Sequence, residues 1–264
     1  MYLEYWGFKR FPFENVPDPD FMYYSQEHEE GLVRLLYAAK RKKGAALLTG
    51  DVGCGKTILS KVFIQHLPED EYDIGLVINP SLGPIDFFKE ILYQLGLNHD
   101  TNSKADLLNI LNERMLENIK QNKTTLLIID EAQLIFKETF EEIRLLLNFQ
   151  LNDRFLLTLF LIGQPELKGI VGGIKQLDQR IGIRYHLGPL NNEDTIKYIA
   201  FRLKKAGLTR GVFTRQSVAG IYRYSQGIPR KINNICDMSL LVGFGLKKKV
   251  IDSKIIKEVV EDLS

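Results

Sequence analysis

The chain has 264 residues, of which 45% are hydrophobic and 26% are charged, and its formal net charge is +2. This composition is close to that of an average globular protein, and it argues against disorder, a collagen-like repeat or a coiled coil. A net charge so near zero gives no global attraction to nucleic acid or to an anionic membrane, and two cysteines are too few for a disulfide framework.

The first 30 residues are rich in aromatic residues and proline, with Trp6, Phe11-Pro12-Phe13 and Pro19 among them. Proline at this density disfavours a regular helix. We therefore predict that residues 1–30 form an irregular arm that packs on the core. The sequence shows neither a secretory signal nor an apolar stretch of the roughly 18 residues that a membrane span requires, so we expect a cytoplasmic protein with no transmembrane segment of its own.

Five short apolar runs alternate with helical patterns over residues 31–188. The runs are 45–49, 74–78, 126–129, 156–162 and 183–187. Runs that are apolar on both faces are typical of parallel strands covered by helices on both sides. They predict a three-layer α/β/α core with a five-stranded parallel sheet. From Asn192 onward the strand pattern gives way to four helical patterns, which predict an all-helical C-terminal lid over residues 189–264.

A glycine-rich loop follows the first apolar run, with the sequence Gly50-Asp51-Val52-Gly53-Cys54-Gly55-Lys56-Thr57. It fits the phosphate-loop pattern G-x-x-x-x-G-K-[ST], between a strand and a helix. Glycines let several backbone N–H groups turn toward one anion, and the next helix adds its positive end. Lys56 would reach the β- and γ-phosphates, and Thr57 would offer a hydroxyl ligand to Mg²⁺. Cys54 is interpreted as a small filler, with a redox role as the alternative.

The third apolar run delivers two acids, Asp130 and Glu131, to the carboxyl end of a strand. In a parallel sheet this edge is where ligands bind. We expect Asp130 to hold Mg²⁺ through water and Glu131 to orient and polarise the attacking water. The second acid favours hydrolysis, because a protein that acts purely as a switch does not need it.

Polar residues also follow other strands. Gln164 comes after the fourth apolar run, where it would hydrogen-bond the γ-phosphate or the attacking water. The alternative is a polar turn residue before Pro165. Gln133 and Asn79 also follow strand ends and are weaker candidates.

Three arginines are candidates to stabilise the transition state, because hydrolysis needs positive charge at the γ-phosphate. Arg180 precedes the fifth apolar run and Arg184 lies near its start, and either one would serve as a finger supplied from a neighbouring subunit. Arg230 follows Pro229 in the first turn of a predicted helix, where a helical lid would bring it to the nucleotide.

Taken together, these motifs resemble those of the AAA+ P-loop NTPases, and more narrowly the general secretion pathway protein A (ExeA) type. The similar segments are Tyr5-Trp6-Gly7-Phe8 with Pro17-Asp18-Pro19, the Walker A loop Gly50 to Thr57, the Walker B segment Leu126 to Gln133, the sensor 1 region Gly163 to Leu167, the arginine-finger box Gln179-Arg180-Ile181 and the sensor 2 region Gly227 to Asn233.

The resemblance implies an ATP hydrolase that uses ATP and Mg²⁺ at a subunit interface in a ring or a filament. It also implies that Arg230 acts in cis, that Arg180 acts in trans and that Tyr23 lies near the adenine. The family member of type II secretion carries a transmembrane helix and a peptidoglycan-binding domain after its ATPase. We expect here a form that assembles or remodels a separate secretion or export partner, at the inner face of a membrane.

Two alternatives stay open at this point. Transposition-regulator ATPases share much of the motif set and bind DNA, and the basic runs Lys40 to Lys43 and Lys247 to Lys249 would contact phosphates. Such runs are more often solvated faces, and with a net charge of +2 we favour the secretion-type interpretation. The other alternative is a nucleotide-gated scaffold with little turnover.

Overall fold

The computed structural model describes residues 2–152, 154–208 and 210–263. The chain divides into two compact units, and each unit is built from segments that are separated in the sequence. The sheet unit comprises Glu29–Gly50 and Leu59–Leu187. The helical unit comprises Met1–His28, Asp51–Ile58 and Gly188–Ser264.

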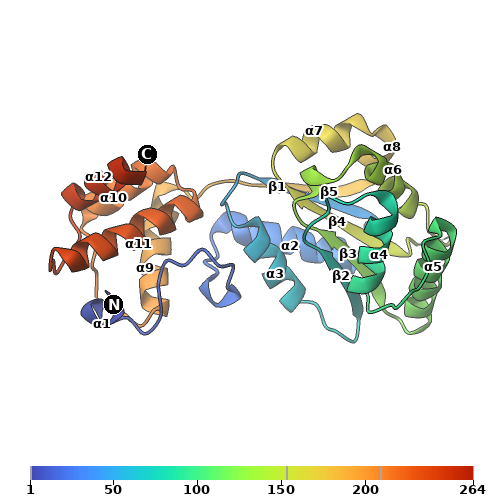
Figure 1. Ribbon diagram of the computed structural model, residues 1–264, viewed down its shortest axis with the longest axis horizontal. Helices are drawn as coiled ribbons and strands as arrows, with labels where there is room; N and C mark the ends of the chain where they lie inside the picture. Colours follow the sequence, from blue (N-terminus) through green and yellow to red (C-terminus); the bar gives the residue numbers. More distant parts are fainter. Residues whose placement is uncertain (1, 153, 209, 264) are drawn as a thin grey trace. The chain divides into compact units, whose positions relative to one another are not determined.

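Five parallel strands form the centre of the sheet unit (Figure 1). They are β1 (Ala45–Gly50), β2 (Tyr72–Val77), β3 (Thr124–Ile129), β4 (Leu157–Gly163) and β5 (Ile181–Leu187). Their order in the sheet is β2-β3-β4-β1-β5. The three central strands are buried along nearly their whole length, as expected where helices cover both faces. The predicted five-stranded parallel sheet is confirmed.

The strand register brings the carboxyl ends of the central strands to one edge. Thr49 near the end of β1 pairs with Gly163 at the end of β4. Ile129 at the end of β3 pairs with Leu161 of β4 and with Val77 at the end of β2. Residues that immediately follow β1, β3 and β4 therefore leave the sheet at the same edge.

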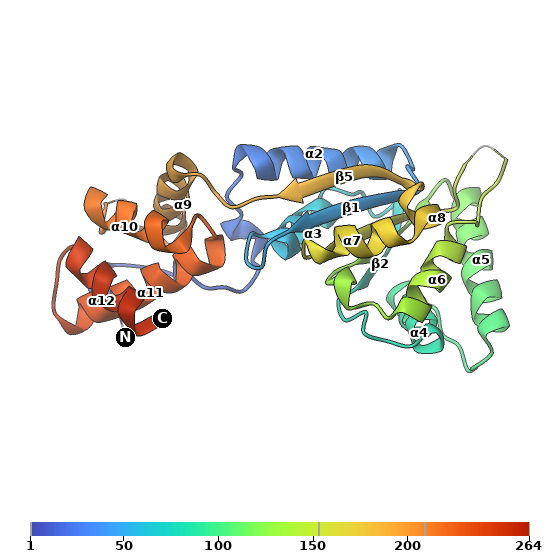
Figure 2. The ribbon, with the colours of Figure 1, turned by 90° about the horizontal axis from the view of Figure 1, so that it is seen from above.

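Helices cover both faces of the sheet. They are α2 (Gln26–Lys40), α3 (Lys56–Gln65), α4 (Pro84–Gln94), α5 (Lys104–Lys120), α6 (Lys137–Leu146), α7 (Glu166–Gly173) and α8 (Lys175–Asp178), with a 3-10 turn η2 (Ala132–Leu134) after β3. On one face, Leu127 and Leu159 share a core with helices α4 to α8. On the other face, Phe160 packs against Phe63 of α3 with ring centroids 4.9 Å apart, and Figure 2 shows α2 running along β5. The three predicted layers are confirmed.

Four helices make up most of the helical unit: α9 (Asn192–Lys205), α10 (Arg215–Ser225), α11 (Pro229–Gly245) and α12 (Ser253–Leu263). Asn191 and Thr214 cap α9 and α10, because their side chains accept hydrogen bonds from backbone N–H groups in the first turn. Pro229 occupies the first position of α11, where its missing N–H group is not needed. The predicted helical C-terminal region is confirmed. None of the described helices is both long and apolar enough to cross a membrane.

The N-terminal arm is more regular than the prolines indicate, and it packs elsewhere than we expected. It contains helix α1 (Tyr2–Trp6) and the 3-10 turn η1 (Pro19–Phe21). We expected residues 1–30 to pack on the α/β core. Instead, Trp6, Phe8 and Phe13 are buried in the core of the helical unit, and the Trp6 indole donates a hydrogen bond to the Leu240 carbonyl at 3.0 Å. Helix α1 is compatible with the prolines because it ends before the first of them.

Candidate active site

The phosphate loop begins where β1 ends and leads directly into α3. Gly53 and Gly55 have φ angles of +84° and +102°, in a region of backbone conformation that residues with a side chain rarely adopt. A Cβ atom on Gly53 would lie 2.7 Å from the Cβ of Arg230, and one on Gly55 would lie 3.0 Å from Nε2 of His28. The glycines are therefore required both by the backbone conformation and by what packs against the loop.

Lys56 and Thr57 occupy the first turn of α3. Lys56 is buried, and its Nζ donates a hydrogen bond to the carbonyl of Asp51 at 3.1 Å. This contact folds the lysine back over its own loop, with its charge next to the helix N-terminus. A cation and several N–H groups gathered in this way form a site for an anion.

Cys54 is buried in the loop and is not activated. Burial raises the pKa of its thiol to about 11, and the nearby Asp51 carboxylate acts in the same direction. A thiol in this state is a poor nucleophile. The geometry supports the filler interpretation over the redox alternative.

His28 contacts the loop from α2, at the end of the N-terminal arm. Its Nε2 lies 3.2 Å from the carbonyl oxygen of Cys54, and its Nδ1 lies 2.7 Å from Oγ of Ser25. Burial lowers the pKa of His28. The neutral ring then donates from Nε2 to the carbonyl and accepts from the Ser25 hydroxyl. Sequence reasoning missed this role, because no spacing pattern connects residue 28 with residue 54.

Arg230 lies at the start of α11, against the loop. Its backbone N–H donates to the Gly53 carbonyl at 3.2 Å, and its side chain is exposed. Gly227, three residues earlier, has a φ of +74°, and a Cβ there would lie 1.8 Å from the Leu190 carbonyl oxygen. This tight turn fixes where α11 begins, and therefore fixes the position of Arg230 beside the phosphate loop.

A small aromatic cavity of about 40 Å³ adjoins the loop within the helical unit, lined by Tyr23, His28, Gly55 and Arg202 among others. The Tyr23 hydroxyl donates to Asp194 at 2.9 Å, and its ring lies 6.0 Å from that of Tyr198. Tyr23 is therefore placed beside the loop.

Arg202 is a buried residue of this cavity that sequence reasoning missed. It donates to the carbonyls of Pro12 and Glu14 at 2.5 and 2.7 Å, and its guanidinium lies 4.6 Å from the Phe21 ring centroid. It ties the N-terminal arm to α9. Its position on a predicted amphipathic helix indicated only an ordinary basic residue.

At the edge of the sheet, Asp130 and Glu131 follow β3. Asp130 is buried, and its Oδ1 accepts a hydrogen bond from the Glu131 N–H at 2.9 Å. The Asp130 N–H donates to Val77, which extends the strand pairing by one residue. Glu131 adopts a left-handed conformation, with φ 50° and ψ 37°. The two consecutive carboxylates have different partners, since the Asp130 carboxylate accepts from a backbone N–H and the Glu131 carboxylate accepts from side-chain amides.

Two glutamines hold the Glu131 carboxylate. Gln133 donates from Nε2 to Oε2 of Glu131 at 2.5 Å, and Gln164 donates to the same oxygen at 3.4 Å. Gln133 also accepts from the Gln164 N–H at 3.0 Å, so it joins the ends of β3 and β4. Gln133 is thus more central than its position in the sequence indicated, whereas Asn79 is exposed after the end of β2.

Arg180 immediately precedes β5 and Arg184 lies within it, and both side chains are held within the sheet unit. Arg180 donates to the Leu147 carbonyl at 2.5 Å and to Asn148 Oδ1 at 2.9 Å. Arg184 forms an ion pair with Asp178 at 2.9 Å. Arg180 is therefore anchored at the end of α6, and Arg184 is engaged by a carboxylate of its own chain.

The comparisons with known proteins agree with this architecture. The family model described as AAA domain matches residues 39–171. General secretion pathway protein A from Aeromonas hydrophila is 38% identical over 247 residues, which cover 92% of this chain and 45% of the relative. The chain therefore spans less than half the length of this relative.

Two solved structures share the fold. The ORC2 protein of Aeropyrum pernix, in ADPNP-ADP complexes, has a TM-score of 0.72 at 17% identity, covering 96% of this chain and 72% of that one. Drosophila ORC bound to DNA has a TM-score of 0.73 at 17% identity, covering 96% and 64%. At this identity the likeness concerns the fold alone. With the family match and the phosphate loop after β1, these findings show that the chain belongs to the AAA domain family of P-loop NTPases.

Proposed function

We propose that this protein is an ATP hydrolase that requires Mg²⁺. The observation that carries the proposal is the Glu131 carboxylate, held by Gln133 and Gln164 at the sheet edge where β1 passes into the phosphate loop. A carboxylate oriented by two amide donors is suited to positioning a water molecule and accepting its proton. A protein that only binds nucleotide has no need of such an arrangement.

The residues of the loop fit an ATP molecule with Mg²⁺. The backbone N–H groups from Asp51 to Gly55 and the Lys56 ammonium would bind the phosphates, and Tyr23 would lie near the adenine. The Thr57 hydroxyl and the Asp130 carboxylate are oxygen donors of the kind that Mg²⁺ prefers. When bound, Mg²⁺ neutralises charge that develops on the phosphate oxygens.

The remaining residues complete the proposed site. Glu131 takes a proton from the attacking water, and Gln164 hydrogen-bonds the γ-phosphate or that water. Arg230 supplies positive charge from the same chain. Arg180 supplies it from a neighbouring subunit, with Arg184 as the alternative finger, so the active form is a ring or a filament.

We infer a partner in a secretion or export system, because the relative that matches 92% of this chain is named General secretion pathway protein A. Nucleotide binding and hydrolysis would drive assembly or remodelling of that partner. The protein would act in the cytoplasm, at the inner face of a membrane through the partner.

The substitution Glu131→Gln tests the proposal, because it keeps the shape of the side chain and removes its basicity. We expect ATP binding within about twofold of wild type and a loss of turnover of about 100-fold or more. Specific activity of the wild type should also rise with protein concentration. A Glu131→Gln variant that retains turnover would favour the scaffold alternative, and a concentration-independent rate would argue against a site shared between subunits.

A further inference from the structure

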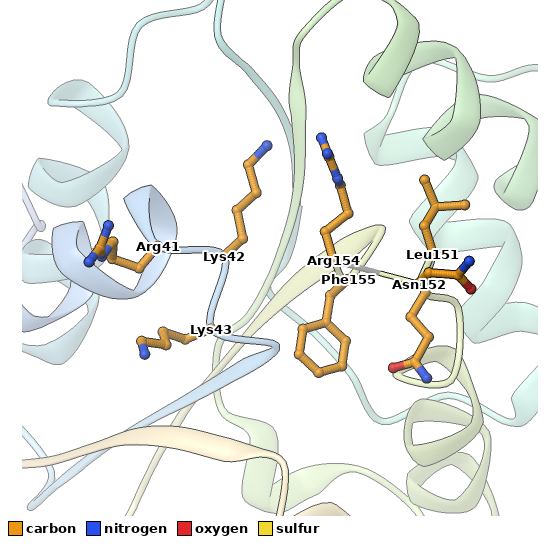
Figure 3. Close-up of a pocket in the computed structure, with 8 residues that line it drawn as sticks. Arg41, Lys42, Lys43, Leu151, Asn152, Arg154 and Phe155 are labelled. Atoms are coloured by element: carbon orange, nitrogen blue, oxygen red, sulfur yellow. The ribbon is translucent and has the colours of Figure 1, made fainter.

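A large basic cavity lies in the sheet unit, and none of its described lining residues is assigned to nucleotide hydrolysis above. Arg180 contacts one of them, with its guanidinium 5.7 Å from the Phe155 ring centroid. Its volume is about 840 Å³ (Figure 3). Four cations line it: Arg41, Lys42, Lys43 and Arg154. They come from the turn before β1 and from the segment before β4, so the cavity adjoins the edge of the sheet where these strands begin. The acids Asp130 and Glu131 follow the other end of a parallel strand.

The backbone of the turn projects three cations in succession. Helix α2 ends at Lys40, and the N–H groups of Lys42 and Lys43 return to the carbonyls of Ala39 and Ala38. Lys42 has a φ of +49° and Gly44 a φ of +74°, so the chain reverses sharply here. The turn is therefore anchored to the helix end and to β1. Because its backbone is held, the turn keeps three consecutive basic residues beside the cavity.

The charged residues that the structure describes in the cavity lining are all basic. Among its described lining residues there are four cations and no acid. In Figure 3 the side chains of Lys42 and Arg154 extend alongside each other from opposite walls. These two residues lie 112 positions apart in the sequence, so the basic run Lys40 to Lys43 accounts for only part of the positive charge at the cavity. A local group of like charges attracts a polyanion even when the net charge of the chain is +2.

The uncharged lining residues point to one kind of polyanion. Phe155 offers an aromatic ring, and the amides of Gln150 and Asn152 offer both donors and acceptors. Cations, one aromatic ring and amides are what single-stranded nucleic acid needs: contacts to phosphates, stacking for a base and hydrogen bonds to base edges. A flat bilayer does not enter a concave site. The volume falls within the range of about 300–1,000 Å³ typical of small-ligand sites, which suits a short segment of a strand.

We propose that this basic cavity binds a single-stranded nucleic acid through its phosphodiester backbone. The proposal does not rest on the proposed ATP hydrolysis, because none of the described lining residues belongs to the phosphate loop or to the acidic pair. If all four cations contact phosphates, the affinity should fall with salt concentration with a logarithmic slope of about −2.8, as four single-strand contacts imply.

The test is fluorescence anisotropy with a labelled 20-nucleotide oligothymidylate, without ATP, over a range of NaCl concentrations. The variant Lys42→Glu with Arg154→Glu should lose at least tenfold in affinity. The milder pair Lys42→Gln with Arg154→Gln should reduce the salt slope by about 1.4. The matched control reverses the charges of Lys247 and Lys248, which are exposed on the helical unit. Its affinity for the oligonucleotide should stay within twofold of wild type. Circular dichroism and ATP turnover check that each variant is folded.

Three results would overturn the proposal. The first is equal affinity in wild type and both cavity variants. The second is displacement of the oligonucleotide by inorganic triphosphate at equal phosphate concentration, which would assign the cavity to small phosphate compounds. The third is an affinity for vesicles of anionic phospholipid that depends on Lys42 and Arg154, while oligonucleotide binding does not.

Discussion

His28 joins two segments of the helical unit, and its replacement tests whether this contact stabilises the unit. Nε2 donates to the Cys54 carbonyl at 3.2 Å, and Nδ1 accepts from Ser25 at 2.7 Å. Both bonds need the neutral ring. Burial, the largest cause, lowers the pKa of His28, while the Cys54 carbonyl and the Asp194 carboxylate oppose the shift.

The expected magnitude follows from these contacts. His28→Ala removes two neutral hydrogen bonds of about 1 kcal/mol each and leaves a cavity costing about 1–2 kcal/mol more, so we expect a loss of about 3–4 kcal/mol in the free energy of unfolding. His28→Gln keeps an amide donor for the Cys54 carbonyl, and should lose only about 1 kcal/mol.

Wild type and His28→Gln should also differ in how their free energy of unfolding depends on pH. The unfolded histidine titrates near its ordinary pKa of about 6.5, whereas the folded one titrates lower. The unfolded state therefore binds the proton first as the pH falls. The contribution of His28 is fully present above about pH 6.5 and declines below it, by up to about 1.4 kcal/mol at pH 5.5. His28→Gln has no such contribution to lose.

The sequence provides a reporter for the measurement. Trp6 is the single tryptophan of the sequence and is buried in the helical unit, so its fluorescence follows unfolding of that unit in urea. Wild type, His28→Ala and His28→Gln are compared at pH 7.5 and 5.5, with His66→Gln, an exposed histidine of the sheet unit, as the control. If wild type and His28→Gln lose the same stability between the two pH values, the reasoning about His28 is wrong.

Two further predictions concern single residues of the candidate site. Arg180→Ala and Glu131→Gln should each abolish turnover alone, and a mixture of the two should regain it, since some sites then combine an intact Glu131 with an intact Arg180 from the neighbour. Activity equal to the sum of the separate variants would contradict a trans role, and Arg184→Ala serves as the comparison. Cys54 should react with a thiol reagent at pH 8 at least 100-fold more slowly than an exposed cysteine, because a pKa of about 11 leaves roughly one thiol in a thousand ionised. Labelling of Cys54→Ser measures the contribution of Cys236, and rapid labelling of the native protein would refute the assignment.

The features that the sequence predicted well are those that depend on contiguous residues. The phosphate loop, the pair Asp130 and Glu131, and the strands before them depend on local spacing, and the parallel sheet follows from the alternation of apolar runs with helices. The layers and the helical C-terminal region were confirmed for this reason. The site roles of Lys56, Glu131 and the arginines stay predictions.

The features that were missed depend on contacts between distant positions. The contact of His28 with Cys54 and the bonds from Arg202 to Pro12 and Glu14 join segments that no periodicity relates. The prediction that the N-terminal arm with Trp6 packs on the α/β core was wrong for the same reason. An aromatic arm fits any apolar surface, and the sequence does not indicate which surface it covers. Gln133 was underestimated, since its two bonds become visible only when β3 and β4 lie side by side.

The chain passes between the two units after residues 28, 50, 58 and 187, and this threading restricts how the protein can be divided. A fragment beginning at residue 189 would lack Trp6 and Phe13 from its own core. A hybrid protein made from two relatives by one crossover at residue 189 would combine α11 of one parent with the phosphate loop of the other. In that hybrid, Arg230 of α11 must still fit against the glycine at position 53. The helical unit is therefore inherited as three separated segments, and exchange between relatives has to move all of them together.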